Sequence, residues 1–459
     1  MKLTMRVAVL GAVMAAGLVM AAEEGAPEFP KFTAGGSFRL RQEAFDHIPI
    51  KVDPPGETRG GLNNYIRFRT QVWGQYDIEQ HVSVYTRLAN EFRHYYDPDN
   101  TSWDFPDEVV VDNAYLDMHN LLADESLTIR IGRQDLAYPG FILGTGRLIL
   151  EGTPKDGSRT IYFDAARFTW KKDDLTLHLI GIYNQSDAEL LINDQHRDIT
   201  GYSSAYNDLD ESGVVLYGTY QVSKQMILES YYIYKHESEW ENGAVSIPEL
   251  DVHTVGARVA NKYNDLLSSN LEVAGQLNER DGRGDVESVD GSGYMVDAAL
   301  KADFMRDSSY KPWSKLGVTL YSGNDPDSSD DESWNPLWGR YPQIGIADLL
   351  AYSYDADGAA KWSNLAFFYG QCGMSVNAKV TLSAMLGQVE ATEADGPGGG
   401  YTRGLYAGTQ VGMALGKPGI TANDSVKSHV VAEMLEPGDY YKSSTETAYF
   451  LRWEVTYTF

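Results

Sequence analysis

The sequence has almost no cysteine. Its 459 residues include a single cysteine, Cys372, so no internal disulfide can form. After residue 20, no apolar run reaches the roughly 20 residues that a membrane-spanning helix needs. The phosphate-binding pattern G-x-x-x-x-G-K-S/T, the zinc motif H-E-x-x-H and cysteine pairs with zinc spacing are also absent. These absences exclude a helical membrane protein and a disulfide scaffold, and the sequence predicts no cofactor.

Basic residues are scarce. There are 38 Lys and Arg against 65 Asp and Glu, a formal charge of −27, which argues against nucleic acid as a partner. The acids are concentrated in turn-rich segments such as 97–108 and 325–332, which we expect to be solvated loops. An alternative is that the second segment binds divalent cations. Its candidate ligands are Asp325, Asp327, Asp330, Asp331 and Glu332.

The first residues have the pattern of an export signal. Lys2 and Arg6 precede an apolar run at 7–20, and small and then acidic residues follow it. This order predicts a signal peptide at 1–22 that is removed from the exported chain. A single membrane anchor is the alternative, but the run is shorter than the roughly 20 residues that a spanning helix needs.

The last fifteen residues, 445–459, alternate between two kinds of side chain. Charged and hydroxyl residues occupy one set of alternate positions, and apolar or aromatic residues occupy the other. The second set is Tyr449, Leu451, Trp453, Val455, Tyr457 and Phe459. A period of two predicts a strand that separates two different environments. Aromatic residues at both ends of the apolar face are typical of a transmembrane β-barrel strand.

Similar patterns recur along the whole chain and predict about eighteen strands. The connections alternate between short ones, such as 77–80, and long ones, such as 46–61. Bacterial barrels pair short periplasmic turns with long extracellular loops. A soluble sandwich or propeller has no reason to follow this rhythm. We therefore predict an all-β, transmembrane antiparallel β-barrel at 23–459 in a Gram-negative outer membrane, with loops 135–159 and 323–361 as candidate constrictors or lids.

Alternation also assigns the charged side chains to a face. An arginine in contact with lipid costs about 2–4 kcal/mol at the bilayer midplane, so arginines are predicted to point inward. On the first strands and the last strand these are Arg39, Arg41, Arg67, Arg69, Arg87, Arg93, Arg130 and Arg452. The strands opposite them offer Arg258, together with Tyr217, Gln221, Gln276, Thr381, Tyr406 and Gln410. A basic wall would then face a polar, aromatic one.

Such a lumen suits an anionic polysaccharide or oligosaccharide, because guanidinium groups bind carboxylates in bidentate fashion. The alternative is that the arginines pair with Glu43, Glu91 and Glu454 and only fill a polar interior. His178 is also predicted to face the lumen, between two leucines of its strand.

Four segments in the first half of the chain resemble a known family. They are AYLDM (114–118), IRIGRQDLAYP (129–139), GRLI (146–149) and SRTIYFDAARF (158–168). In that order they resemble the signature region of the bacterial alginate-export porins. The resemblance implies an eighteen-stranded barrel whose arginine-lined constriction passes anionic uronate polymers. The residues that it implicates are Arg67, Arg69, Arg130, Arg133, Arg147, Arg159, Gln134, Phe163 and Asp164.

Arg133 departs from the alternation of its strand. It has the parity of Ile129 and Ile131, so either it lies beyond the membrane rim or a bulge changes its direction.

The predicted function is therefore an outer-membrane, exporter-like channel for an alginate-like polyuronate or an acidic oligosaccharide. The alternatives are a general, weakly selective porin and, from another class, a barrel enzyme or adhesin. We predict no enzymatic activity, and we expect contact with outer-membrane lipid, no nucleic-acid partner and a monomeric state.

Overall fold

A computed structural model gives the fold. It describes residues 29–48, 62–97, 109–121, 124–138, 150–152, 162–185, 209–242, 245–282, 288–339, 344–347, 349–350, 363–421, 424–441 and 446–459. The predicted signal peptide at 1–22 lies outside these residues.

Eighteen strands form one antiparallel sheet. They are β1 (Lys31–Asp46), β2 (Asn63–Glu79), β3 (Val82–Asp97), β4 (Val110–His119), β5 (Leu127–Gln134), β8 (Phe163–Lys172), β9 (Leu175–Asn184), β10 (Glu211–Gln221), β11 (Met226–Glu237), β14 (Leu250–Lys262), β15 (Leu267–Arg280), β16 (Val289–Asp303), β17 (Trp313–Tyr321), β18 (Leu365–Ser375), β19 (Val380–Glu390), β20 (Thr402–Gly416), β21 (Ser425–Pro437) and β22 (Ala448–Thr458). The predicted fold class and strand number are confirmed.

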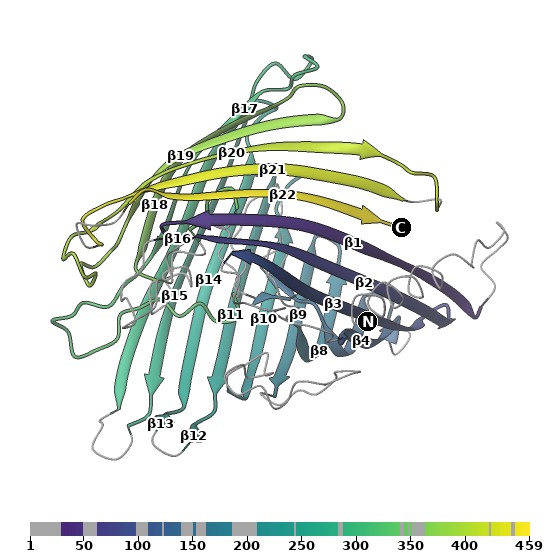
Figure 1. Cartoon of the computed structure of the whole chain (residues 1–459). Coiled ribbons are helices and arrows are strands. Elements are labelled where there is room, and N and C mark those ends of the chain that lie inside the picture. Colours follow the sequence, from purple (N-terminus) through teal and green to yellow (C-terminus); the bar gives the residue numbers. More distant parts are fainter. Residues whose placement is uncertain are drawn as a thin grey trace.

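The sheet closes on itself because the first strand pairs with the last. β1 lies between β2 and β22, and its pairing with β22 runs from Ser37 opposite Thr458 to Asp46 opposite Tyr449. Figure 1 shows the yellow β22 beside the purple β1. Closure leaves the barrel without an edge strand, so every strand has two hydrogen-bonded neighbours.

The two faces of the sheet carry opposite chemistry. Large apolar side chains are exposed on the outside, for example Val255, Leu277 and Leu316, each more than 60% exposed. Charged side chains such as Arg67 and Glu43 are buried inside. This arrangement is the inverse of a soluble protein and is the one that a lipid-facing barrel requires. The described residues contain no helix long and apolar enough to span a bilayer.

The connections follow the predicted rhythm. One end of the barrel has short turns, such as 173–174 between β8 and β9, and the other has long connections, such as 322–364 between β17 and β18. Two small hairpins inside the long connections were not predicted: β6 (Ala137–Tyr138) with β7 (Leu150–Glu151), and β12 (Trp240–Asn242) with β13 (Val245–Ile247). Each strand of these hairpins has two or three residues, too few for alternation to reveal it.

Candidate functional site

The inward arginines of β1, β2, β3 and β22 lie next to one another. The strand register places Arg41 opposite Arg67, and Arg39 opposite Arg69. Like charges in opposite positions of a sheet repel. Carboxylates on the neighbouring strands compensate for this, since Glu454 lies opposite Arg41 on the other side of β1, and Glu91 lies opposite Arg69.

Five guanidinium groups surround three carboxylates in this region, and we call it the arginine–glutamate cluster. Its members are Arg39, Arg41, Arg67, Arg69, Arg452, Glu43, Glu91 and Glu454. The Glu43 carboxylate contacts Arg67 at 2.8 Å, Arg452 at 2.6 Å and Arg41 at 3.4 Å. Glu91 contacts Arg67 at 3.0 Å and Arg39 at 3.1 Å, and Arg41 reaches Glu454 at 2.6 Å.

The members of the cluster differ in exposure. The side chains of Arg67, Arg41 and Arg452 are no more than 2% exposed, and all three contact Glu43. Those of Arg39 and Arg69 are each 9% exposed, and the Arg69 guanidinium lies 3.9 Å from Glu91. The cluster therefore has a buried layer that holds the carboxylates and a layer nearer the lumen.

The basic wall continues along β3 to β5. The Arg87 guanidinium contacts Asp112 at 2.9 Å and Asp135 at 2.7 Å. Arg130 donates two hydrogen bonds to Asp117, at 2.7 and 2.6 Å, and lies 3.8 Å from the centre of the Tyr115 ring. The side chains of Arg87 and Arg130 are 17% and 23% exposed. Both are more exposed than any member of the cluster, of which Glu454 is the most exposed at 13%.

Arg93 belongs to the same wall. The register places it opposite Arg67, and its guanidinium lies 5.0 Å from the centre of the Tyr65 ring and bonds to the Tyr95 hydroxyl at 3.1 Å.

Arg133 occupies a different position. The register of β5 with β4 and with β8 is unbroken, so Arg133 shares a face with Ile131 and lies opposite Asp164. Its guanidinium donates two hydrogen bonds of 2.9 Å to Asp164 and lies 3.6 Å from the centre of the Tyr162 ring. Arg133 is the last residue but one of β5, and its position beyond the membrane rim stays a prediction. Arg147 and Arg159 lie outside the described residues.

The opposite wall is more acidic than the sequence analysis suggested. Arg258 is buried there as predicted, bonded to Glu229 and to Asn270 at 2.7 Å. Its buried acids are Glu211, Glu229, Glu272, Asp297 and Glu433, and its buried bases are Lys235, Arg258 and Arg403. The same alternation could have found these residues, because each occupies an inward position of its strand. Stacked aromatic rings, Tyr217 and Tyr231, lie among them.

The long connection between β17 and β18 enters the barrel. We call residues 334–339, 344–347 and 349–350 of this connection the inward loop. Trp338 is fully buried and donates from its indole nitrogen to Glu211 at 2.9 Å, while the Lys235 ammonium donates to the Leu337 carbonyl at 3.0 Å. These bonds attach the first half of the loop to β10 and β11.

The second half of the inward loop is attached to β20 and β21. The buried Glu433 carboxylate accepts the backbone N–H groups of Ile346, Ala347 and Leu349, at 3.2, 2.7 and 3.0 Å. The Tyr406 hydroxyl also donates to Glu433. The loop therefore crosses between two groups of strands inside the barrel.

The β6–β7 hairpin reaches the same interior. Tyr138 packs against Tyr217 and against His178, with ring centres 4.8 and 5.5 Å apart. The Glu151 N–H donates to the Trp338 carbonyl at 3.1 Å, which joins this hairpin to the inward loop. The described parts of both predicted constrictor loops thus contact each other, and His178 lies inside the barrel beside them.

A polar cavity of about 720 Å³ lies at the end with the long connections. Arg280 and Arg403 line it together with Trp334, Asp331 and Asp395. It adjoins the inward loop, so it forms a vestibule on the side of the long connections.

The acidic segment 325–332 uses its carboxylates to cap turns. Asp325 accepts the N–H of Asp327 at 2.9 Å, and Glu332 accepts that of Asp325 at 3.2 Å. Within the described residues, one set of three metal-binding side chains has its ligand atoms within 4.8 Å, and it consists of His236, Glu249 and Asp251. The cation-binding role of the acidic segment stays a prediction.

Comparison with known proteins gives a family and a set of similar folds. A sequence profile for alginate export matches residues 31–395, while no curated protein matches the sequence. OccAB3 of Acinetobacter baumannii is 12% identical with a TM-score of 0.56, and the match covers 93% of this chain and 99% of that chain. OccK2 (OpdF) of Pseudomonas aeruginosa in complex with glucuronate is 11% identical with a TM-score of 0.51, covering 93% and 97%. At such identities the solved structures show a shared fold.

Proposed function

The chain belongs to the alginate export family and is a barrel of the Gram-negative outer membrane, and from this premise we propose that it conducts an anionic solute along its arginine wall. The solute is an alginate-like polyuronate or an acidic oligosaccharide. One observation carries the proposal: inward guanidinium groups are gathered on β1 to β5 and β22, while the strands opposite carry more buried acids than bases.

This separation of charge favours a path for anions on one side of the lumen. Arg87, Arg93 and Arg130 are the half-buried members of the basic wall, and Arg39 and Arg69 follow with side chains 9% exposed. A carboxylate that passes them can accept charge-assisted hydrogen bonds. The buried Arg41, Arg67 and Arg452 keep the glutamates in place instead. Arg39, Arg87 and Arg130 also pair with carboxylates, so the arginines proposed to contact solute differ from the buried ones in their access to the lumen.

The size and shape of the solute follow from two further features. The glucuronate complex of OccK2 concerns a similar barrel and supports a uronate as the repeating unit. The inward loop and the β6–β7 hairpin narrow the lumen, which favours an extended chain over a bulky one. We propose that the mature chain starts after residue 22 and acts as a monomer.

Planar-bilayer recording tests the proposal. The wild-type channel should be anion selective in a salt gradient, and the variants Arg69→Gln and Arg130→Gln should lower that selectivity. Arg306→Gln is the matched control, because Arg306 is an exposed arginine on a short connection, 47% exposed and paired with Asp265. A selectivity near unity in the wild type would favour the general porin, and absence of conductance would favour the enzyme or adhesin.

A second measurement identifies the solute class. Oligomers of a uronate should block the single-channel current, and neutral oligosaccharides of equal length should not. Equal block by both would show that the arginines do not select the cargo.

A further inference from the structure

The outer face of the barrel carries a group of metal-binding side chains at the end with the long connections. On β11 the residues Glu229, Ile233 and Lys235 are buried and face inward, so His236 has the outward parity. The register places His236 opposite Asp251, which has the outward parity of β14. Glu249 immediately precedes β14. Strand pairing therefore brings together side chains that are 15 residues apart in sequence.

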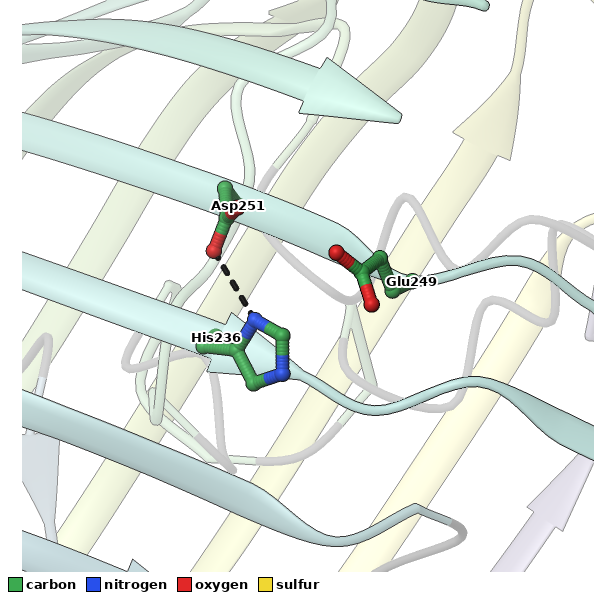
Figure 2. Close-up of side chains that lie close together, drawn as sticks. All are labelled: His236, Glu249 and Asp251. Atoms are coloured by element: carbon green, nitrogen blue, oxygen red, sulfur yellow. Dashed lines mark hydrogen bonds and ion pairs between the residues drawn. The ribbon is translucent and has the colours of Figure 1, made fainter. Parts of the chain in front are cut away.

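The three side chains converge on one point. Figure 2 shows the imidazole of His236 close to the carboxylates of Asp251 and Glu249, with its hydrogen bond to Asp251 drawn as a dashed line. The Nδ1 atom of His236 lies 2.9 Å from Oδ1 of Asp251, and the three ligand atoms lie within 4.8 Å of one another. The Tyr234 hydroxyl donates to the same Oδ1 at 2.8 Å and so orients the carboxylate. Ligands of a bound metal are commonly held by such outer hydrogen bonds.

The outward-facing residues around this group are acidic, which favours the binding of a cation. Across the neighbouring strands Asp251 lies opposite Glu279, and Glu279 lies opposite Asp290, all with outward parity. Like charges directly opposite each other destabilise a sheet. Among the described residues, Glu249 has no side-chain hydrogen bond or ion pair that would offset its charge. In the part of the chain that the structure describes, His236 is the one basic group that contacts Asp251.

We propose that His236, Glu249 and Asp251 form a binding site for a divalent transition metal, with zinc as the best fit. Imidazole nitrogen and carboxylate oxygen together suit zinc, whereas calcium and magnesium prefer oxygen ligands alone. Three protein ligands leave one position open toward the exterior, as at zinc sites that bind a further ligand. The ion would join the end of β11 to the start of β14 and hold Glu249, the last residue of the connection between them, against the barrel wall.

Titration of the full, metal-stripped chain in detergent with zinc chloride tests the site. Calorimetry should give one zinc ion per chain, and His236→Ala and Asp251→Asn should each weaken binding by about tenfold or more. Cobalt should replace zinc with a visible absorption band typical of four ligands, and His236→Ala should abolish that band.

The matched control is His253→Ala. His253 has the same outward parity on β14 but bonds to the Tyr232 hydroxyl at 2.9 Å and is outside the group. The His253→Ala variant should bind zinc with the same affinity as the wild type. The proposal is overturned if the wild type binds no zinc, or if the His253→Ala and His236→Ala variants lose the same affinity. Circular dichroism of each variant confirms that the barrel has folded, and Glu249→Gln serves if His236→Ala does not fold.

Discussion

Replacing Glu433 by alanine should release the second half of the inward loop from the barrel wall. The Glu433 carboxylate accepts three backbone N–H groups of the loop, from Ile346, Ala347 and Leu349. A hydrogen bond to a charged group contributes about 1.5–3 kcal/mol. At the low end of that range the three bonds sum to about 4.5 kcal/mol. This value corresponds to roughly a two-thousandfold change in the equilibrium between docked and undocked loop.

Hydrogen exchange measures this equilibrium directly. In Glu433→Ala the amides of Ile346, Ala347 and Leu349 should exchange about two-thousandfold faster. Amides of the neighbouring strands β20 and β21 should keep their protection, because their ladder hydrogen bonds are unchanged. Single-channel conductance should rise as well, since the loop then leaves the lumen.

Two variants serve as controls for the loop. Glu436→Ala makes the same chemical change on the same strand, but Glu436 is exposed and should change neither measurement. Tyr406→Phe removes one donor to Glu433 and one acceptor for Ile346, so its effect should be smaller than that of Glu433→Ala. If the three amides gain less than tenfold in exchange rate, Glu433 does not hold the loop.

The remaining predictions concern stability and processing. Arg67→Met should lower the free energy of unfolding in urea by about 3 kcal/mol, because it leaves two buried glutamates with one cation fewer. Gly132→Ala should lower the unfolding temperature, since the new Cβ would lie 2.3 Å from a backbone oxygen at a φ of +122°, whereas Gly181→Ala meets nothing within 4 Å and should be neutral. Desolvation and neighbouring carboxylates raise the pKa of Glu393 in its loop, so its ionised form opposes folding. The Glu393→Gln variant should therefore melt higher than the wild type at neutral pH, and the difference should vanish as acid protonates the wild type. Mass spectrometry of the exported chain should give Glu23 as its first residue.

The strand number and the inward arginines could be predicted because each depends on local alternation. A lipid-facing strand cannot tolerate a charge outside, so parity alone places Arg39, Arg69 and Arg87 inside. The same rule applies to Glu229 and Lys235 on β11, which the sequence analysis did not use. The acidic character of the second wall was therefore within reach of the sequence.

The inward loop and the metal-binding group could not be predicted in the same way. The contact of Trp338 with Glu211 joins residues 127 positions apart, and no local pattern encodes it. His236 and Asp251 meet only because β11 and β14 pair in one register, and a shift by one residue would send one of them to the other face. For Arg133, the register agrees with its parity, and the resemblance to a family implicated both Arg133 and its partner Asp164 without pairing them.

The seam between β1 and β22 has a consequence for how the barrel assembles. Arg452 bonds to Glu43, 409 residues away in sequence, and Arg41 bonds to Glu454, 413 residues away. Until β22 meets β1, Arg452 and Glu454 lack these partners, and unpaired buried charges are costly. A barrel whose last strand is missing or misaligned is thus destabilised, because only the correct register brings Arg452 to Glu43 and Glu454 to Arg41. Closure of the barrel thereby selects the correct register between its first and last strands.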